Sequence, residues 1–360
     1  MAQEYASPGN RTAKPSYATK IESSVGHSGL ECKSETACAS AKPTVSDQRG
    51  VLFMAPSTTW PTLPFSEWKD TYATLHMWTQ IVGKVRLALC PPINHCWGVA
   101  LYVTARGLTT SPIPYQDGSF EITFDFVAHS LEIATSRGET RAFQLKPRTV
   151  AEFYAELMGA LHSLGIEVKV WTMPVEVPRP VRFTLDESHA SYDSEYAHRF
   201  WQIVVSVSNV FWEFRSRFIG KSSPVHFFWG SFDLAVTRFS GRRAPERTDA
   251  DTFMKDAYSH EVSSVGFWPG DGEVIKDAAF YAYAVPEPAG FKECSVRPAK
   301  AFYHPEKGEY FLMYDHVRSA ENPAETLLEF CQSTYEAAAI AGKWDRANLE
   351  RQSTATAGAG

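Results

Sequence analysis

The feature that most constrains the fold is an alternating apolar segment followed almost at once by a second strand-like segment. Phe120-Glu-Ile-Thr-Phe-Asp-Phe126 places its apolar side chains on one side of an extended chain, as in a half-buried strand. Leu131–Thr135 follows after a short interval, which leaves no room for the crossover that parallel strands require. The two segments therefore predict an antiparallel pair.

Other strand-like segments also come in groups, with helical patterns between the groups. Strands are predicted over 97–104, 166–170, 225–239, 258–267, 279–285 and 309–314. Helices are predicted over 66–89, 149–165, 193–218 and 322–342, with Ser66, Thr149, Asp193 and Asn322 as N-caps. This order predicts an α+β fold of mainly antiparallel sheets with long packed helices, and argues against a doubly wound parallel sheet.

The chain is expected to consist of one large domain between two tails. Residues 1–50 are rich in Ser, Thr, Ala, Lys and Gly and carry few apolar anchors, so we expect a disordered N-terminal tail. Residues 351–360 are expected to form a similar C-terminal tail. Residues 51–350 are expected to form a single α+β domain, and the prolines near 174–186 leave open a boundary between two lobes there. The sequence reveals no internal repeat.

Charge and cysteine content limit the location and the partners. The 35 basic and 41 acidic residues give a net charge of −6, which does not favour nucleic acid or an anionic membrane as a partner. No secretory signal is visible, and no apolar run approaches the roughly 18 residues of a membrane span. The six cysteines contain no C-x-x-C pair, which is typical of reduced thiols. We expect a soluble cytoplasmic protein, and its oligomeric state stays open.

The most site-like stretch is 221–241, where ionisable side chains interrupt an aromatic strand. It contains Lys221, His226, Ser231, Asp233 and Arg238, and Arg242 follows directly. Burying such groups is costly unless they are paired. Strand alternation puts His226 and Asp233 on opposite faces, but a bulge at Gly230 would bring them to one face. The stretch is therefore either a pocket wall or a core strand with a buried His–Asp hydrogen bond.

Two further segments carry candidate residues. His260 and Glu261 are neighbours, so on a strand they point in opposite directions, and a plain strand end explains them equally well. His76 lies beside the apolar stripe of the first helix, where a lone histidine is otherwise a satisfied core residue. A transition metal held by dispersed His226, His260, Glu261 and His76 is chemically conceivable, although their spacing does not demonstrate it.

Four blocks of sequence resemble a known family. The blocks are Thr74–Lys84, Leu101–Ser111, Ser223–Asp233 and Tyr258–Val262. They resemble the bacterial domain-of-unknown-function family numbered 5996, and the resemblance covers about Trp60 to Glu350. It implies no activity. It does imply that the following polar residues recur together: His76, Gln80, Lys84, Arg106, His226, Asp233, Arg238, Arg242, His260 and Glu261. Cys96 and Met313 depart from the family pattern and put only local packing in doubt.

Three hypotheses for the function follow. The first is an enzyme acting on a small anionic molecule, with His226 or His260 as acid–base group and Asp233 or Glu261 beside it. His76 completes this catalytic set. An anionic group would be held by Lys84, Arg106, Lys221, Arg238 and Arg242, while Trp229 and Trp268 would exclude water. The second hypothesis is a small-molecule-binding protein without catalysis, and the third is a structural or interaction domain.

Overall fold

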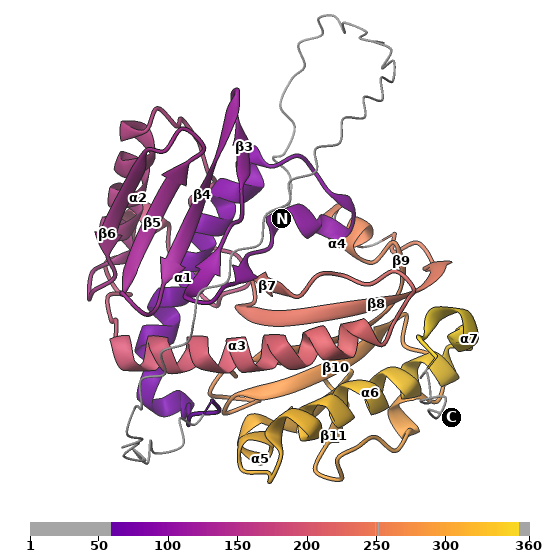
Figure 1. Cartoon of the computed structure of the whole chain (residues 1–360). Coiled ribbons are helices and arrows are strands. Elements are labelled where there is room, and N and C mark those ends of the chain that lie inside the picture. The colour runs from indigo at the N-terminus through magenta and orange to yellow at the C-terminus, as the bar shows by residue number, and fades with distance from the viewer. Residues whose placement is uncertain (1–58, 249, 251, 353–360) are drawn as a thin grey trace, which may run out of the picture. The chain divides into compact units, whose positions relative to one another are not determined.

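The computed structural model describes residues 59–248, 250 and 252–352. The predicted tail 1–50 lies outside the described residues, and so does most of the predicted tail 351–360. Helices and two antiparallel sheets make up the described part, which confirms the α+β prediction (Figure 1). None of the helices in this part combines the length and apolarity needed to cross a bilayer.

The first half of the described chain forms the N-terminal sheet and its helices. Its elements are α1 (Phe65–Leu89), the 3₁₀ segment Asn94–Val99, β1 (Tyr102–Val103), β2 (Gly107–Thr109), β3 (Ile113–Tyr115), β4 (Gly118–Asp125), β5 (Ser130–Thr135), β6 (Thr140–Gln144) and α2 (Val150–Ser163). The strands run in the order β1-β2-β4-β5-β6, with β3 also paired to β4, and all pairs are antiparallel.

The second half forms the C-terminal sheet. Its elements are α3 (Ser194–Ser216), β7 (His226–Phe228), β8 (Asp233–Arg243), α4 (Thr252–Ala257), β9 (His260–Trp268), β10 (Ala279–Val285), β11 (Phe302–His304), β12 (Glu309–Met313), α5 (Tyr314–Arg318), α6 (Pro323–Ala341) and α7 (Arg346–Leu349). Short 3₁₀ segments occur at Phe183–Leu185 and Phe291–Glu293. The antiparallel strand order is β11-β12-β10-β9-β8-β7.

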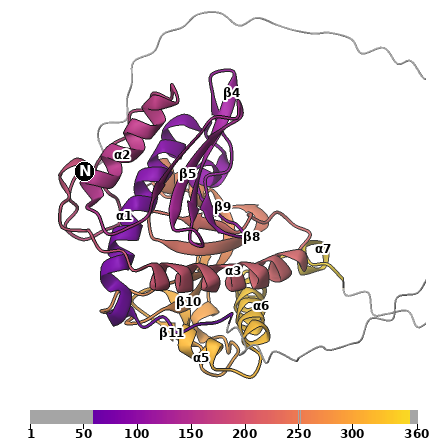
Figure 2. The ribbon, with the colours of Figure 1, turned by 60° about the vertical axis from the view of Figure 1, so that its left-hand side comes forward.

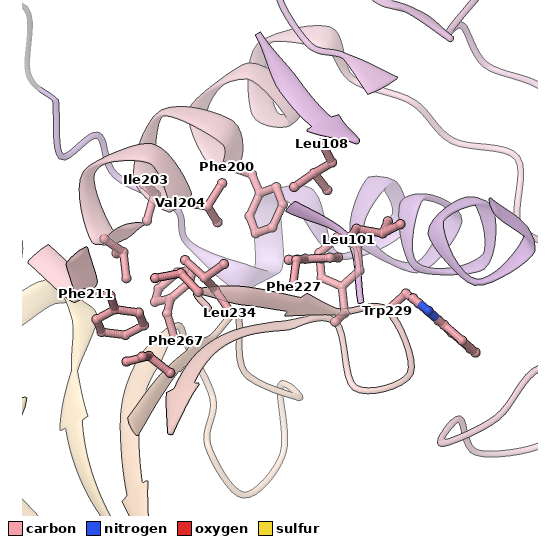
Figure 3. Close-up of a cluster of buried hydrophobic side chains, with 14 of the residues drawn as sticks. Leu101, Leu108, Phe200, Ile203, Val204, Phe211, Phe227, Trp229, Leu234 and Phe267 are labelled. Atoms are coloured by element: carbon pink, nitrogen blue, oxygen red, sulfur yellow. The ribbon is translucent and has the colours of Figure 1, made fainter. Parts of the chain in front are cut away.

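Helices α3 and α6 lie on one face of the C-terminal sheet (Figures 1 and 2). Phe200, Ile203, Val204 and Phe211 of α3 pack over Phe227, Leu234 and Phe267 of the sheet (Figure 3). This apolar layer fixes which face of β8 is buried under helices. Because side chains alternate along a strand, the residues between these apolar positions point to the opposite face.

The two halves are joined by a backbone bridge at the start of their first strands. The backbones of Leu101 and Phe227 exchange two hydrogen bonds of 2.9 and 2.8 Å. Leu108 and Leu234, each seven residues further along, lie in the same cluster (Figure 3). The two halves therefore share one apolar cluster around this bridge.

Most of the predicted elements are present, with four corrections. The predicted strand over 97–104 was too long, because Asn94–Val99 is a 3₁₀ segment and the strand covers only Tyr102–Val103. Ser66, the predicted cap of the first helix, lies inside that helix. Thr149 forms a capping box, and Asp193 and Asn322 cap α3 and α6 as expected. No side chain caps α1, which starts at Phe65 after Pro64. The prediction of a strand over 166–170 was wrong, because this extended segment pairs with no strand. The predicted strand 225–239 is instead two strands, β7 and β8, joined by a turn at 229–232.

Gly83 on α1 marks the closest approach of that helix to the β7–β8 turn. The Trp229 indole lies across it, and a Cβ built on Gly83 would come within 2.3 Å of the ring. The indole cannot easily yield, because its Nε1 donates to the Val99 carbonyl at 2.8 Å. We expect Gly83→Ala to lower the free energy of unfolding by about 1–3 kcal/mol, as overpacking does. Urea denaturation checks this, with Gly159→Ala, whose Cβ meets open space, as the control.

Candidate functional site

The face of the C-terminal sheet away from α3 and α6 is polar, and we call it the polar face. It carries Asp233, Thr237, Ser264, Tyr281, Tyr283 and Glu309. Strand register places them together, since Ala235 pairs with Gly266, Thr237 with Ser264, and Gly266 with Tyr281. Phe228 and Trp268 add aromatic surface to the same face.

Asp233 is the most deeply buried acid on this face, with 6% of its surface exposed. Its two oxygens accept hydrogen bonds from different hydroxyls. Ser231 donates to Oδ1 at 2.9 Å, and Tyr281 donates to Oδ2. No described Lys, Arg or His forms an ion pair with this carboxylate. The carboxylate is thus oriented by neutral donors without compensation of its charge.

This environment moves the pKa of Asp233 toward neutral pH. Burial raises the pKa of Asp233 to about 6, against the opposing effect of the Tyr281 and Ser231 hydroxyls. The nearby Glu176 carboxyl raises this pKa further by charge repulsion. Burial also raises the pKa of Glu176 itself. Two carboxyl groups with raised pKa therefore flank Ser231.

At two glycines an ionisable side chain lies directly against the backbone. The Tyr281 ring lies directly over Gly266, where a Cβ would come within 2.2 Å of the ring. The Glu176 carboxyl lies over Gly230, where a Cβ would come within 2.6 Å of Oε1. Glycine is required at Gly266, where the rigid Tyr281 ring lies against the backbone, whereas the flexible Glu176 side chain could shift away from a Cβ at Gly230.

A tyrosine pair extends the polar network away from Asp233. Tyr281 and Tyr283 stack with ring centroids 6.0 Å apart, and the Tyr283 hydroxyl lies 3.0 Å from that of Tyr258. Burial raises the pKa of both stacked tyrosines. Further along the face, burial raises the pKa of Glu309 to about 7. The face thus holds several protons that are retained at neutral pH.

The turn that carries Ser231 is held by His76. Its Nε2 lies 2.7 Å from the Gly230 carbonyl, which can only accept, so Nε2 carries the proton. Burial lowers the pKa of His76 to about 4. Phe232, in the same turn, has φ of 58° and is packed against Phe200 and Phe227. A bulky residue in the left-handed region is strained and is often found at functional sites.

His226 shares the polar face with Asp233, although the cause is a hairpin and not a bulge. In the hairpin, His226 pairs with Ala235 and Phe228 with Asp233, which puts all four on one side. The His226 ring touches Trp97, Tyr102 and Phe228 at centroid distances of 5.4–5.8 Å. Burial, with Arg86 and Arg215 nearby, lowers the pKa of His226 to about 3.

Lys221 and His260 meet at the other end of β8, around His95. Nδ1 of His95 faces the carbonyls of Asp256 and Ala257 at 3.2 and 3.3 Å, so it carries the proton. Nε2 then accepts from Lys221 Nζ at 2.6 Å. The His260 ring lies 5.3 Å from that of His95. This group packs on Phe239, six residues or roughly 20 Å along β8 from Asp233.

Of the remaining predicted residues, only Trp268 lies next to Asp233, since Leu234 pairs with Phe267 in the same ladder. Arg238 points to the helix side and stacks on Phe214 and Tyr335. Arg242 pairs with Glu261 and donates to the last carbonyls near α6. Arg106 pairs with Asp125 in an exposed turn. Lys84 and Trp229 lie together beside α1, while Trp268 ends β9 on the polar face.

The sequence matches one known protein family over nearly all of the described residues. A model described as a family of unknown function (DUF5996) matches residues 60–351. The chain belongs to this family. No curated protein and no solved structure matches.

Neither the cavity described next nor a cluster of metal-binding side chains among the described residues adds a second candidate site to the polar face of the DUF5996 domain. A cavity of about 580 Å³ lies elsewhere, between Trp60–Thr62 and the first turns of α3. None of the residues predicted from sequence lines it. Within 59–248, 250 and 252–352, no group of three or more His, Cys, Asp and Glu side chains is arranged to share a metal ion.

Sequence reasoning missed Glu176, Tyr281, Tyr283 and His95 in this DUF5996 chain. Tyr281 and Tyr283 had a signal, because they alternate on a predicted strand and so share a face. Glu176 and His95 lie in irregular segments, where no periodicity relates them to the sheet. Their position depends on the packing of loops that are distant in sequence.

Proposed function

We propose that the protein is an enzyme that transfers protons to and from a small polar molecule at Asp233. The observation that carries the proposal is a buried carboxylate without a described cationic partner, oriented by two hydroxyls on the sheet face opposite α3 and α6. Its pKa of about 6 suits a general base near neutral pH. Such perturbed groups concentrate at functional sites.

The roles of the neighbouring groups follow from their contacts. Tyr281 and Ser231 position the Asp233 carboxylate and stabilise its charged form. Glu176, whose carboxyl also lies beside Ser231, is the partner acid, because two close carboxyl groups separate into one protonated and one ionised group. His226 stays neutral and borders the site through Phe228.

The charges at the site refine the substrate class. Asp233 and Glu176 would repel an anionic reacting group, so the reacting end of the substrate is uncharged or cationic. Lys221, which was expected to hold an anionic group, lies roughly 20 Å along β8 from Asp233. Arg238 points to the opposite face of the sheet. A small, uncharged polar substrate therefore fits better than a small anion.

A second candidate function is binding without chemistry. The specific observation in its favour is the aromatic lining of the polar face by Phe228, Trp268 and Tyr281. Flat aromatic surfaces with a few fixed hydroxyls suit binding as well as catalysis. In that case Asp233 accepts hydrogen bonds from the ligand and no compound is converted.

Incubation with a protein-free metabolite extract, followed by mass spectrometry over time, tests the proposal. Wild-type protein is expected to consume at least one compound, and Asp233→Asn to do so at least 100-fold more slowly, as loss of an acid–base group predicts. Asp117→Asn, an exposed surface change, is the matched control. Equal consumption by Asp233→Asn contradicts the proposal, whereas an unchanged compound that copurifies with both variants favours binding.

A further inference from the structure

Lys84 lies in the protein interior although it carries an amine. It is on α1, one turn after Gln80, and only 4% of its surface is exposed. Three rings surround its Nζ: Trp171 at 4.8 Å, Trp229 at 5.8 Å and Phe183 at 6.0 Å from the ring centroids. Lysines are rarely buried to this extent unless they are paired.

The amine has no acidic or hydrogen-bonding partner in the described part of the chain. Its interactions there are those with the three aromatic rings. Gln80, the nearest polar residue on the same helix face, is already engaged with the backbone of Val175 through both its oxygen and its nitrogen. A purely structural lysine would gain more from a carboxylate, so the unpaired amine calls for a chemical explanation.

The surroundings increase the fraction of neutral, nucleophilic amine at Lys84. Burial lowers the pKa of Lys84 from 10.5 to about 8, and no neighbouring charge contributes to the shift. Desolvation in a hydrophobic pocket is one of the ways in which proteins activate lysine as a nucleophile. Trp171, which covers Nζ, is 51% exposed, so a small molecule needs to pass only one solvent-exposed ring to reach the amine.

We propose that Lys84 is a nucleophilic amine that forms an imine with a small aldehyde or ketone. The neutral Nζ attacks the carbonyl carbon, and a proton moves from nitrogen to oxygen to give a carbinolamine. The carbinolamine then loses water, which leaves a C=N bond to Nζ. The aromatic cage suits this product because it excludes the water that would hydrolyse it. This inference concerns a group separate from Asp233 and does not depend on the proposed function.

Reductive trapping tests the inference. The full chain is incubated at pH 8 with glycolaldehyde and sodium cyanoborohydride, and the initial rate of alkylation at each lysine is measured by peptide mass spectrometry. About half of an amine with a pKa near 8 is neutral at this pH, against about 0.3% for an ordinary exposed lysine. We expect Lys84 to react at least tenfold faster than Lys69, an exposed lysine on the same helix.

Variants and pH separate specific reactivity from incidental labelling. The rate at Lys84 is expected to level off above pH 8, and Lys84→Arg is expected to remove the fast site while circular dichroism confirms the fold. Trp171→Leu removes the indole that covers Nζ. It is expected to change the rate of alkylation at Lys84 and to leave the rate at Lys69 unchanged. Labelling of Lys84 no faster than Lys69, or a rate that still rises steeply to pH 10, overturns the inference.

Discussion

Asp233→Asn is expected to raise the free energy of unfolding by about 2 kcal/mol at pH 8, although it removes the proposed catalytic base. The carboxylate is buried with a pKa raised from 3.8 to about 6. A shift of about two units corresponds to about 3 kcal/mol between protonation states. Asparagine stays neutral, and its side-chain oxygen can still accept from Tyr281. Proteins commonly sacrifice stability at sites of chemistry.

The sign of the pH dependence follows from proton uptake. Between pH 4 and pH 6 the folded protein holds a proton on Asp233 that the unfolded chain has released, so the wild type loses stability as the pH rises through this window. The two proteins should therefore be equally stable near pH 4 and diverge up to pH 6. Urea denaturation at pH 4, 5, 6 and 8 measures the difference in free energy of unfolding between the two proteins. His76 and His226 contribute equally to the pH dependence of both proteins, so their contributions cancel in this difference.

The opposite outcome is informative as well. If Asp233→Asn is less stable than the wild type at pH 8, the hydrogen bonds from Tyr281 and Ser231 outweigh the cost of burying the charge. Asp233 would then be a structural residue. Tyr281→Phe separates the cases, because losing this donor should raise the pKa of Asp233 further and extend the decline in stability to higher pH.

Arg238→Ala is expected to lower the free energy of unfolding by about 3–4 kcal/mol, whereas Arg238→Met should stay within about 1 kcal/mol of the wild type. The guanidinium carbon lies 3.5 Å from the centroid of Phe214 and 4.3 Å from that of Tyr335. Its Nε has no hydrogen-bond partner among the described residues, and burial lowers its pKa to about 10. Methionine restores the volume without the buried charge.

Thermal and urea denaturation of the pair decide whether Arg238 acts through volume or through charge. If Met is as destabilising as Ala, the charge itself is needed, and the anion-binding role expected from sequence regains support. The exposed Arg106→Ala, which loses only a surface ion pair with Asp125, is expected to change stability by less than about 1 kcal/mol.

The sequence predicts the fold class and most helices because caps and periodicity are local signals. It misplaces the β7–β8 turn, because Trp229-Gly-Ser-Phe232 lacks the Asn-Gly or Asp-Gly pattern of a tight hairpin. Packing of Phe232 against Phe200 and Phe227 stabilises that turn instead. Segment 166–170 alternates like a strand but has no neighbouring strand to pair with.

The candidate site was predictable only in part, because composition identifies ionisable residues without giving the face on which they lie. His226 and Asp233 were singled out from the sequence, and they do share a face. Arg238 was grouped with them, yet alternation along β8 turns it toward α3. That distinction requires knowing which face the helices cover, which is a long-range property of the fold.

The two halves differ at one position counted from their shared backbone bridge. When Leu101 is matched with Phe227 and Leu108 with Leu234, the residue that corresponds to Asp233 is Gly107. A Cβ at Gly107 would lie 1.8 Å from the Phe124 carbonyl oxygen, so no side chain fits there. At the position six residues after the bridge, only the C-terminal half has space for a side chain, and that side chain is the Asp233 carboxylate.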